Sequence, residues 1–335
     1  MPLPPDNLVA RSRSPRNSGG RKLLLLGINL ALCVFFVRWL NQNIRLDLLI
    51  GYFRTIPPWA VVVSILINFA ALVGYGMRMA LLLRKDFLTS FSIINIGYAL
   101  NTLTPLRLGE AVKIYLASRL YSISATQLLA GTLVEKLIDL FKLLLLGLLV
   151  VAYATETLVD LPTLIAPAIV IAVALTGVIG FRWLIARIDR FLPEGNNIRR
   201  VLVDIHRHSG EYPWARIFAV SVAIWTLNVL LVYFVFNAYL GPLDFHLLDA
   251  IALLLVLAFA IAIPSAPAGL GLFEAGVVAY LTRFFHVTNE GALAAAVVFH
   301  LAISIPQLCF LGGVMLRHQW KAKHALAQQA DNIGR

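Results

Sequence analysis

The chain has 335 residues, of which 60% are apolar and only 13% are charged, and its mean hydropathy is +0.83. These values exclude a soluble globular protein, and the length leaves room for roughly six to ten membrane passages but for no sizeable soluble domain. The net charge of +11 comes mostly from the tails and from the segments between apolar runs, where it orients a membrane protein, so we expect no nucleic-acid partner.

The amino-terminal residues 1–20 are rich in Pro, Ser, Arg and Asn and predict a disordered, basic cytoplasmic tail. Residues 21–320 form a single predicted membrane domain, and residues 321–335 form a second cytoplasmic tail. The first apolar run, Leu23–Leu40, has no small-residue cleavage site after it and therefore predicts a retained helix rather than a signal peptide.

Apolar runs of membrane-spanning length predict six spanning helices. They are Leu23–Leu40, Trp59–Leu83, Leu128–Ala152, Leu164–Phe181, Ile217–Leu240 and Leu293–Leu316. Two further apolar stretches, Phe91–Leu120 and Ile251–Phe285, are each broken near the middle by proline and glycine. We interpret both as re-entrant helical hairpins with these breaking residues: Pro105 and Gly109 in the first, and Pro264, Pro267, Gly269 and Gly271 in the second.

The distribution of basic residues supports this topology. Of the 28 Lys and Arg, four fall within predicted membrane segments, and only Arg38, Arg45, Arg54 and Arg283 fall outside the cell. The other 20, with Arg78 among them, fall on the cytoplasmic side, which also holds both termini. We therefore predict a multi-pass protein of the inner (plasma) membrane, whose two hairpins enter from opposite faces.

Opposed hairpins suggest an internal repeat. A shift by about 160 to 165 residues lays the broken segments on each other, brings Glu110 near Glu274, and aligns residues of about 59–155 with those of about 217–316. The matched spans run in opposite directions. Inverted repeats with broken helices at corresponding positions are typical of secondary transporters, whose substrate site lies where the breaks meet. The predicted fold class is thus an all-α polytopic membrane protein with an inverted repeat.

Eight charged residues fall within the predicted membrane segments, where each would be costly unless it is paired or faces water or a ligand. They are Arg107, Glu110, Lys113, Glu135, Lys136, Asp139, Lys142 and Glu274. Glu135, Asp139 and Lys142 share one helix face, which can point at the first hairpin.

Two interpretations of these charges stay open. In the first they form a polar cavity, where Arg107 binds a phosphate and Glu135 and Asp139 hold the arginine or relay protons. In the second they form a structural ion network that only docks hairpin and helix. Lys136 and Lys142 are interpreted as snorkelling residues outside the site.

Uncharged residues add to the candidate site. Asn101 and Thr104 beside the first break can hydrogen-bond a substrate or their own helix. His300 falls near Glu135 under the repeat and is either a packing or a site residue. Cys33 and Cys309 have no spacing typical of a metal site, and we expect no metal and no cofactor.

Three motifs together carry a family resemblance. These are Asn101–Glu110 (NTLTPLRLGE) followed by Lys113, then Glu135–Asp139 (EKLID), and Pro264–Glu274 (PSAPAGLGLFE). They resemble the lysylphosphatidylglycerol synthase transmembrane-region family, the flippase-like membrane domain found at the amino-terminal end of multiple peptide resistance factors, over about residues 20 to 320. The resemblance implies movement of a phospholipid, hopanoid or polyprenyl-phosphate-linked lipid between leaflets. The cytosolic aminoacyl transferase domain of the fused members is not expected here, so we expect a stand-alone transporter and not an enzyme.

The predicted substrate-binding residues are Arg107, Glu110, Lys113, Glu135, Asp139, Glu274, Asn101 and Thr104, with no catalytic residue. The predicted partner is a membrane lipid with a phosphate head group, and both a homo-oligomer and a lipid-synthesising enzyme partner are compatible with the sequence. The alternative function is that of a membrane glycosyltransferase with a polyprenyl-phosphate sugar donor. Such enzymes usually have an acidic pair in the first external loop, where residues 42–58 offer only Asp47.

Overall fold

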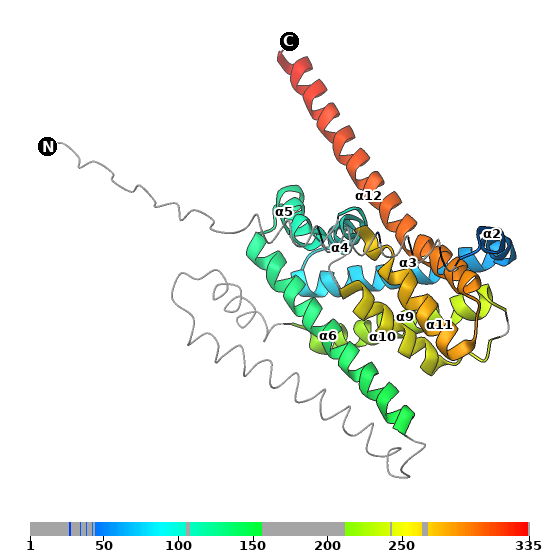
Figure 1. Cartoon of the computed structure of the whole chain (residues 1–335). Helices are drawn as coiled ribbons and strands as arrows, with labels where there is room; N and C mark the ends of the chain where they lie inside the picture. Colours follow the sequence, from blue (N-terminus) through cyan, green and yellow to red (C-terminus); the bar gives the residue numbers. More distant parts are fainter. Residues whose placement is uncertain are drawn as a thin grey trace.

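The computed structural model describes residues 44–104, 108–155, 212–241, 243–262 and 267–333, together with positions 27, 34, 38 and 42; side chains at 152, 154, 155 and beyond 317 are left aside. The regular structure of these residues is entirely helical, as the composition predicts (Figure 1). The helices are α2 (Leu46–Thr55), α3 (Pro58–Leu83), α4 (Phe87–Leu103), α5 (Gly109–Tyr121), α6 (Ala125–Thr155), α9 (Trp214–Tyr239), α10 (Leu247–Ala262), η2 (Pro267–Gly269), α11 (Leu272–Phe285) and α12 (Asn289–Ile333).

Three of the described helices are long and apolar enough to cross a membrane, namely α3, α9 and residues Asn289–Arg317 of α12. The predicted spans Trp59–Leu83, Ile217–Leu240 and Leu293–Leu316 overlap them almost completely. The predicted span Leu128–Ala152 lies within α6, an apolar helix that also carries charged residues. Leu164–Phe181 lies outside the described residues, and so does Leu23–Leu40 apart from isolated positions.

Each of the two interrupted apolar stretches folds as a pair of helices packed against each other. α4 begins at the cap residue Asp86, whose carboxylate accepts a hydrogen bond from the Thr89 N–H, and this bond lowers the pKa of Asp86. α5 returns along α4 so closely that a Cβ at Gly109 would collide with the Asn101 backbone nitrogen. Gly109 therefore marks the start of α5, and glycine is required there because α5 touches α4.

The second pair consists of α10 and α11, and a tight turn directly precedes α11. Ala268, Gly269 and Gly271 have positive φ angles of 59°, 78° and 87°. Glycine tolerates this region without steric cost, which explains the two glycines of the sequence Ala268–Gly271. The turn ends where Glu274 in the first turn of α11 accepts a hydrogen bond from the Gly271 N–H, at 2.7 Å.

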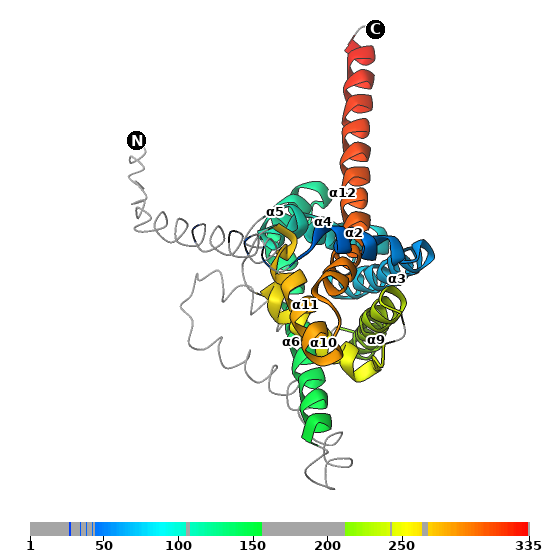
Figure 2. The same ribbon diagram turned by 45° about the vertical axis from the view of Figure 1, so that its right-hand side comes forward.

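The helices are packed around an aromatic core between α9, α10, α11 and α12, in which Phe236, Phe273 and Phe299 are almost completely buried. α3 packs along α9, α4 contacts α12, and α6 contacts α10. The carboxyl-terminal part of α12 projects beyond the other helices, as both Figure 1 and the turned view in Figure 2 show. This arrangement brings the ends of the two helix pairs, α4 and η2, into contact.

Candidate functional site

A cavity of about 680 Å³ lies where the two helix pairs meet. Asn101 and Thr102 at the end of α4 line it from one pair, and Ala268 and Gly269 of η2 line it from the other. Its remaining walls come from α3, α5, α6, α9, α10, α11 and α12. The polar side chains on the wall are Asn68, Tyr75, Tyr98, Asn101, Thr102, Glu110, Lys136, Asp139, Lys142, Asn228, His300, Ser304 and Gln307.

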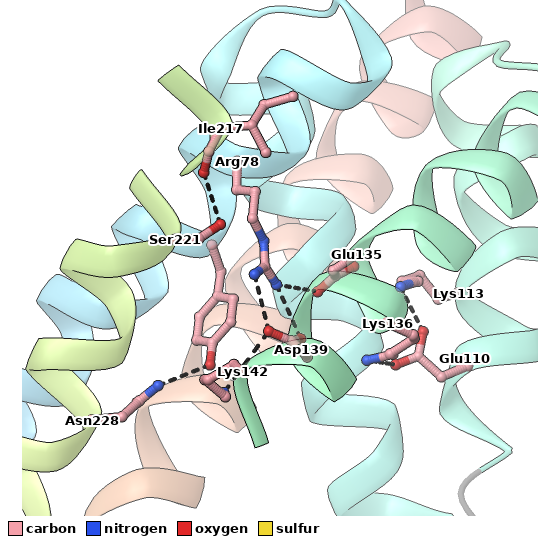
Figure 3. Close-up of polar contacts among 11 residues, drawn as sticks. Arg78, Glu110, Lys113, Glu135, Lys136, Asp139, Lys142, Ile217, Ser221 and Asn228 are labelled. Carbon is pink, nitrogen blue, oxygen red and sulfur yellow. Dashed lines mark hydrogen bonds and ion pairs between the residues drawn. The ribbon is translucent and has the colours of Figure 1, made fainter. Parts of the chain in front are cut away.

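The largest ionic contact beside the cavity is centred on Arg78 of α3, whose side chain is 0% exposed. Its two terminal nitrogens donate to the two oxygens of Asp139 at 2.9 and 3.1 Å, and one of them also donates to Glu135 at 3.4 Å (Figure 3). The guanidinium lies 5.2 Å from the centre of the Tyr75 ring. A bidentate pair of this kind fixes both the distance and the orientation between α3 and α6.

The position of Arg78 corrects the sequence analysis, which counted it with the cytoplasmic charges. The structure places it inside α3, because the helix continues through the apolar residues Met79–Leu83 beyond it. Glu135 and Asp139 were predicted to hold Arg107; the arginine that they hold in the structure is Arg78. The sequence did contain a signal for this pairing. Two carboxylates on one face of α6 need a cation opposite them, and Arg78 is a basic residue within an apolar run.

A second ionic group links α5 to α6. Glu110 contacts Lys113 of its own helix at 2.5 Å and Lys136 of α6 at 2.9 Å (Figure 3). The Lys113 side chain is almost completely buried, whereas that of Lys136 is 45% exposed. The interpretation of Lys136 as a snorkelling residue was therefore wrong, because its ammonium turns to a carboxylate on the cavity wall.

Lys142 also lies on the cavity wall and not at a membrane surface. Its side chain is only 10% exposed, and its ammonium is 3.8 Å from Asp139, beyond hydrogen-bond distance. Asp139 already receives two hydrogen bonds from Arg78. Within the described residues, Lys142 is thus a buried cation whose donors keep capacity for a ligand.

Glu274 and His300 form the third polar group. The imidazole Nδ1 of His300 lies 2.6 Å from Glu274 Oε1, and both side chains are buried. His300 lines the cavity, while Glu274 lies behind it. His300 is therefore in contact with the second helix pair, and its ring also packs at 4.4 Å from that of Phe273.

The remaining predicted site residues divide into three sets. Asn101 lines the cavity, and within the described part of the chain its buried Oδ1 has no hydrogen-bond partner, whereas Thr104 donates to Leu100 of its own helix at 2.6 Å. Lys113, Glu135 and Glu274 do not line the wall; Lys113 and Glu274 contact the lining residues Glu110 and His300, and Glu135 contacts Arg78 behind the wall. Arg107, Pro105 and Pro264 lie outside the described residues, so the phosphate-binding role of Arg107 stays a prediction. Among the residues described, no three His, Cys, Asp or Glu side chains gather as metal ligands would.

A comparison with protein families matches residues 24–310 to the family described as the lysylphosphatidylglycerol synthase TM region. The chain belongs to this family. The match covers the helices that build the cavity and extends over most of the chain, so the resemblance carried by the three motifs is confirmed. A search of curated proteins found no match. Together with the three membrane-spanning helices, membership of the lysylphosphatidylglycerol synthase TM-region family supports a multi-pass membrane protein.

Glu110→Gln should destabilise the protein much more than Lys136→Gln. The first change leaves the buried Lys113 ammonium without its carboxylate, which we expect to cost about 1–3 kcal/mol or more. The second removes a half-exposed partner and should cost less than about 1 kcal/mol. Thermal unfolding in detergent, followed by size-exclusion chromatography, measures both. Equal melting temperatures for the two variants would contradict the burial of the Glu110–Lys113 pair.

Proposed function

We propose that the protein is a lipid transporter, which moves a polar or anionic lipid between leaflets through the central cavity. The observation that carries this proposal is the cavity itself, which is large enough for a phospholipid head group and has polar and charged side chains on an otherwise mostly apolar wall within a membrane domain. Polar and charged groups inside a membrane are expensive and are typical of substrate pathways. The family match is to the membrane region of a lipid synthase, and a membrane domain associated with a phospholipid is in keeping with this proposal.

An inverted repeat is supported by side-chain contacts that recur at one sequence offset. Glu274 follows Glu110 in the sequence by the same number of residues as His300 follows Lys136. Lys136 is the partner of Glu110, and His300 is the partner of Glu274. This common offset therefore relates two carboxylates and two basic partners. Each pair joins the returning helix of a hairpin to the long helix that follows it.

The same offset relates two contacts between α3 and α9. It leads from Ser64 to Asn228 and from Tyr75 to Tyr239. Ser64 hydrogen-bonds Tyr239 at 2.7 Å, and Asn228 donates to Tyr75 at 3.0 Å. Each contact thus becomes the other when the two halves are exchanged, as expected for a two-fold axis between antiparallel α3 and α9.

Backbone features recur in the same way. Ser122 and His286 end α5 and α11 in the left-handed conformation with φ of 52° and 53°. The following helices α6 and α12 begin at Ala125 and Asn289, which the same offset relates. Together with the contact pairs, these features support two repeats, each with a re-entrant hairpin.

The topology that follows has six spanning helices and both termini in the cytoplasm, in the inner (plasma) membrane. The two repeats have opposite orientations, so the hairpins α4–α5 and α10–α11 enter from opposite faces. The short segment at Asp244, between α9 and α10, then lies outside. Its lack of Lys and Arg, and the basic segment 182–216, agree with the positive-inside rule.

The chemistry of the wall favours a head group with a phosphate. Around Glu110, Glu135 and Asp139 there are four cations, namely Arg78, Lys113, Lys136 and Lys142. Lys142 keeps hydrogen-bonding capacity, and neutral groups such as Asn68, Asn228 and Gln307 can bind hydroxyl or ester oxygens. We propose transport without a synthase activity; a homo-oligomer and a lipid-synthesising partner are compatible with it.

Blocking the cavity should abolish transport while leaving the fold intact. Ala258 of α10 lines the cavity, whereas the next residue, Phe259, is 72% exposed on the outer face. Ala258→Trp should lower the rate of lipid movement at least about tenfold, because the indole occupies the path of the head group, and Phe259→Trp should change it little. Both are measured in reconstituted vesicles with a fluorescent anionic phospholipid, normalised to folded protein. Equal rates for the two variants would rule out the cavity as the pathway.

A further inference from the structure

The Glu274–His300 pair is a buried acid–base pair on the cavity wall. The side chains are 4% and 8% exposed, respectively. One oxygen of Glu274 faces His300 Nδ1 at 2.6 Å, and the other accepts the Gly271 N–H at 2.7 Å. Both carboxylate oxygens are thus used. Among the described residues, the second imidazole nitrogen, Nε2, has no protein partner.

In the other half of the molecule, the corresponding carboxylate is paired with lysines, which stay charged at neutral pH. Glu110, the counterpart of Glu274 under the common offset, is bound by two lysines, Lys113 and Lys136. At the position of Lys136, the second half has His300. A lysine ordinarily titrates far above neutral pH, whereas an imidazole is the side chain whose ordinary titration lies close to it. The two pairs therefore occupy matching positions, but only the Glu274–His300 pair contains a side chain of a type that gains or loses a proton near neutral pH.

We propose that His300 and Glu274 form a proton-binding site that couples proton movement to lipid transport, an inference that rests on the transport function proposed above. The proton binds the Nε2 lone pair and gives an imidazolium that the Glu274 carboxylate stabilises. Its release breaks the same N–H bond and leaves a neutral imidazole beside a carboxylate. The bound proton therefore changes the charge of the pair from −1 to zero.

This change of charge lies on the wall that the lipid head group must pass. An anionic head group is repelled by the deprotonated pair and accepted by the protonated one, so that proton and lipid favour each other's binding. Thermodynamic linkage makes this effect reciprocal. A proton gradient across the membrane can then drive the lipid in one direction.

The other titratable groups on this wall do not take over the proton-binding role proposed for His300. They are Tyr75, Tyr98, Glu110, Lys136, Asp139 and Lys142. Glu110 and Asp139 are held by lysine and arginine, and tyrosines ordinarily titrate well above neutral pH. The described parts of α9 and α10 contribute no titratable side chain to the wall.

The test measures lipid movement in reconstituted vesicles with a fluorescent anionic phospholipid at pH 6 and pH 8, and with a pH-sensitive dye inside. We expect the wild-type rate to be about tenfold higher at pH 6, and the dye to report proton movement when lipid moves. His300→Gln keeps a similar volume and should remove both responses. His300→Lys installs the ammonium found at Lys136 and should move lipid at a rate that does not depend on pH. His246→Gln, in the exposed segment before α10, is the matched control and should behave as the wild type.

The outcomes separate the two claims. A wild-type rate that is equal at both pH values, or a pH response that persists in His300→Gln, overturns the coupling and leaves lipid transport standing. If the wild type moves no lipid at any pH, the proposed function fails and the coupling fails with it. The glutamine variant alone decides the question if the lysine variant does not fold.

Discussion

Arg78→Gln should destabilise the protein by about 3–5 kcal/mol, the typical cost of removing one partner from a buried ion pair. The arginine is completely buried, and without it Asp139 and Glu135 are left as carboxylates in a low-dielectric interior, where Lys142, at 3.8 Å from Asp139, makes no hydrogen bond to replace those of Arg78. The expected result is a sharp fall in folded yield and in melting temperature, measured by size-exclusion chromatography after heating in detergent.

The double change Arg78→Gln, Asp139→Asn should recover part of this loss, because it deletes the bidentate pair instead of stranding one half. Glu135→Gln is the matched single change, and it should cost less, since Arg78 then keeps both hydrogen bonds to Asp139. A double variant that is less stable than Arg78→Gln alone would contradict the pairing.

Gly109→Ala should separate the helices of the first hairpin. A Cβ at this position would collide with both the backbone nitrogen and the Oδ1 of Asn101, and a backbone atom cannot move aside cheaply. We expect a loss of about 1–3 kcal/mol, the usual cost of overpacking. Transport should fall as well, because Asn101 lies on the cavity wall.

Gly147→Ala is the control for this change. Gly147 lies inside α6 with no neighbouring atom within 4 Å of an added Cβ. Alanine is favoured over glycine in a helix by roughly 0.5–1 kcal/mol, so the variant should be neutral or slightly more stable. Melting temperatures of the two alanine variants, measured side by side, check the prediction. A Gly109→Ala protein as stable as Gly147→Ala would show that α4 and α5 do not pack as described.

The helical class and the helix breaks could be predicted from the sequence because they depend on local properties. Apolar runs of fixed length give α3, α9 and α12, and proline with glycine gives the two interruptions. An inverted repeat was predicted from the sequence as well, since Glu110 and Glu274 are rare acidic residues at matching places, and it stays a prediction. Local patterns sufficed for the helical class and for the helix breaks.

The partners of the charged residues could not be predicted in the same way. Arg78 is near the end of an apolar run, where a basic residue usually marks the membrane surface, and only the packing of α3 on α6 buries it. Lys136 was predicted to lie outside the site, because helical periodicity turns it away from Glu135. In the structure, however, Glu110 of α5 lies on the face of α6 to which Lys136 points. Pairings of this kind depend on how helices dock, which no single helix encodes.

Photo-crosslinking tests most directly whether lipid enters the cavity. A phospholipid analogue with a diazirine in its head group is incorporated into vesicles with the protein, activated by light, and mapped by peptide mass spectrometry. The proposed pathway predicts labelling of cavity residues such as Asn228, Ser304 and Thr102, and its loss in Ala258→Trp. Labelling confined to outward residues such as Leu144 and Phe259, unchanged by Ala258→Trp, would contradict transport through the cavity.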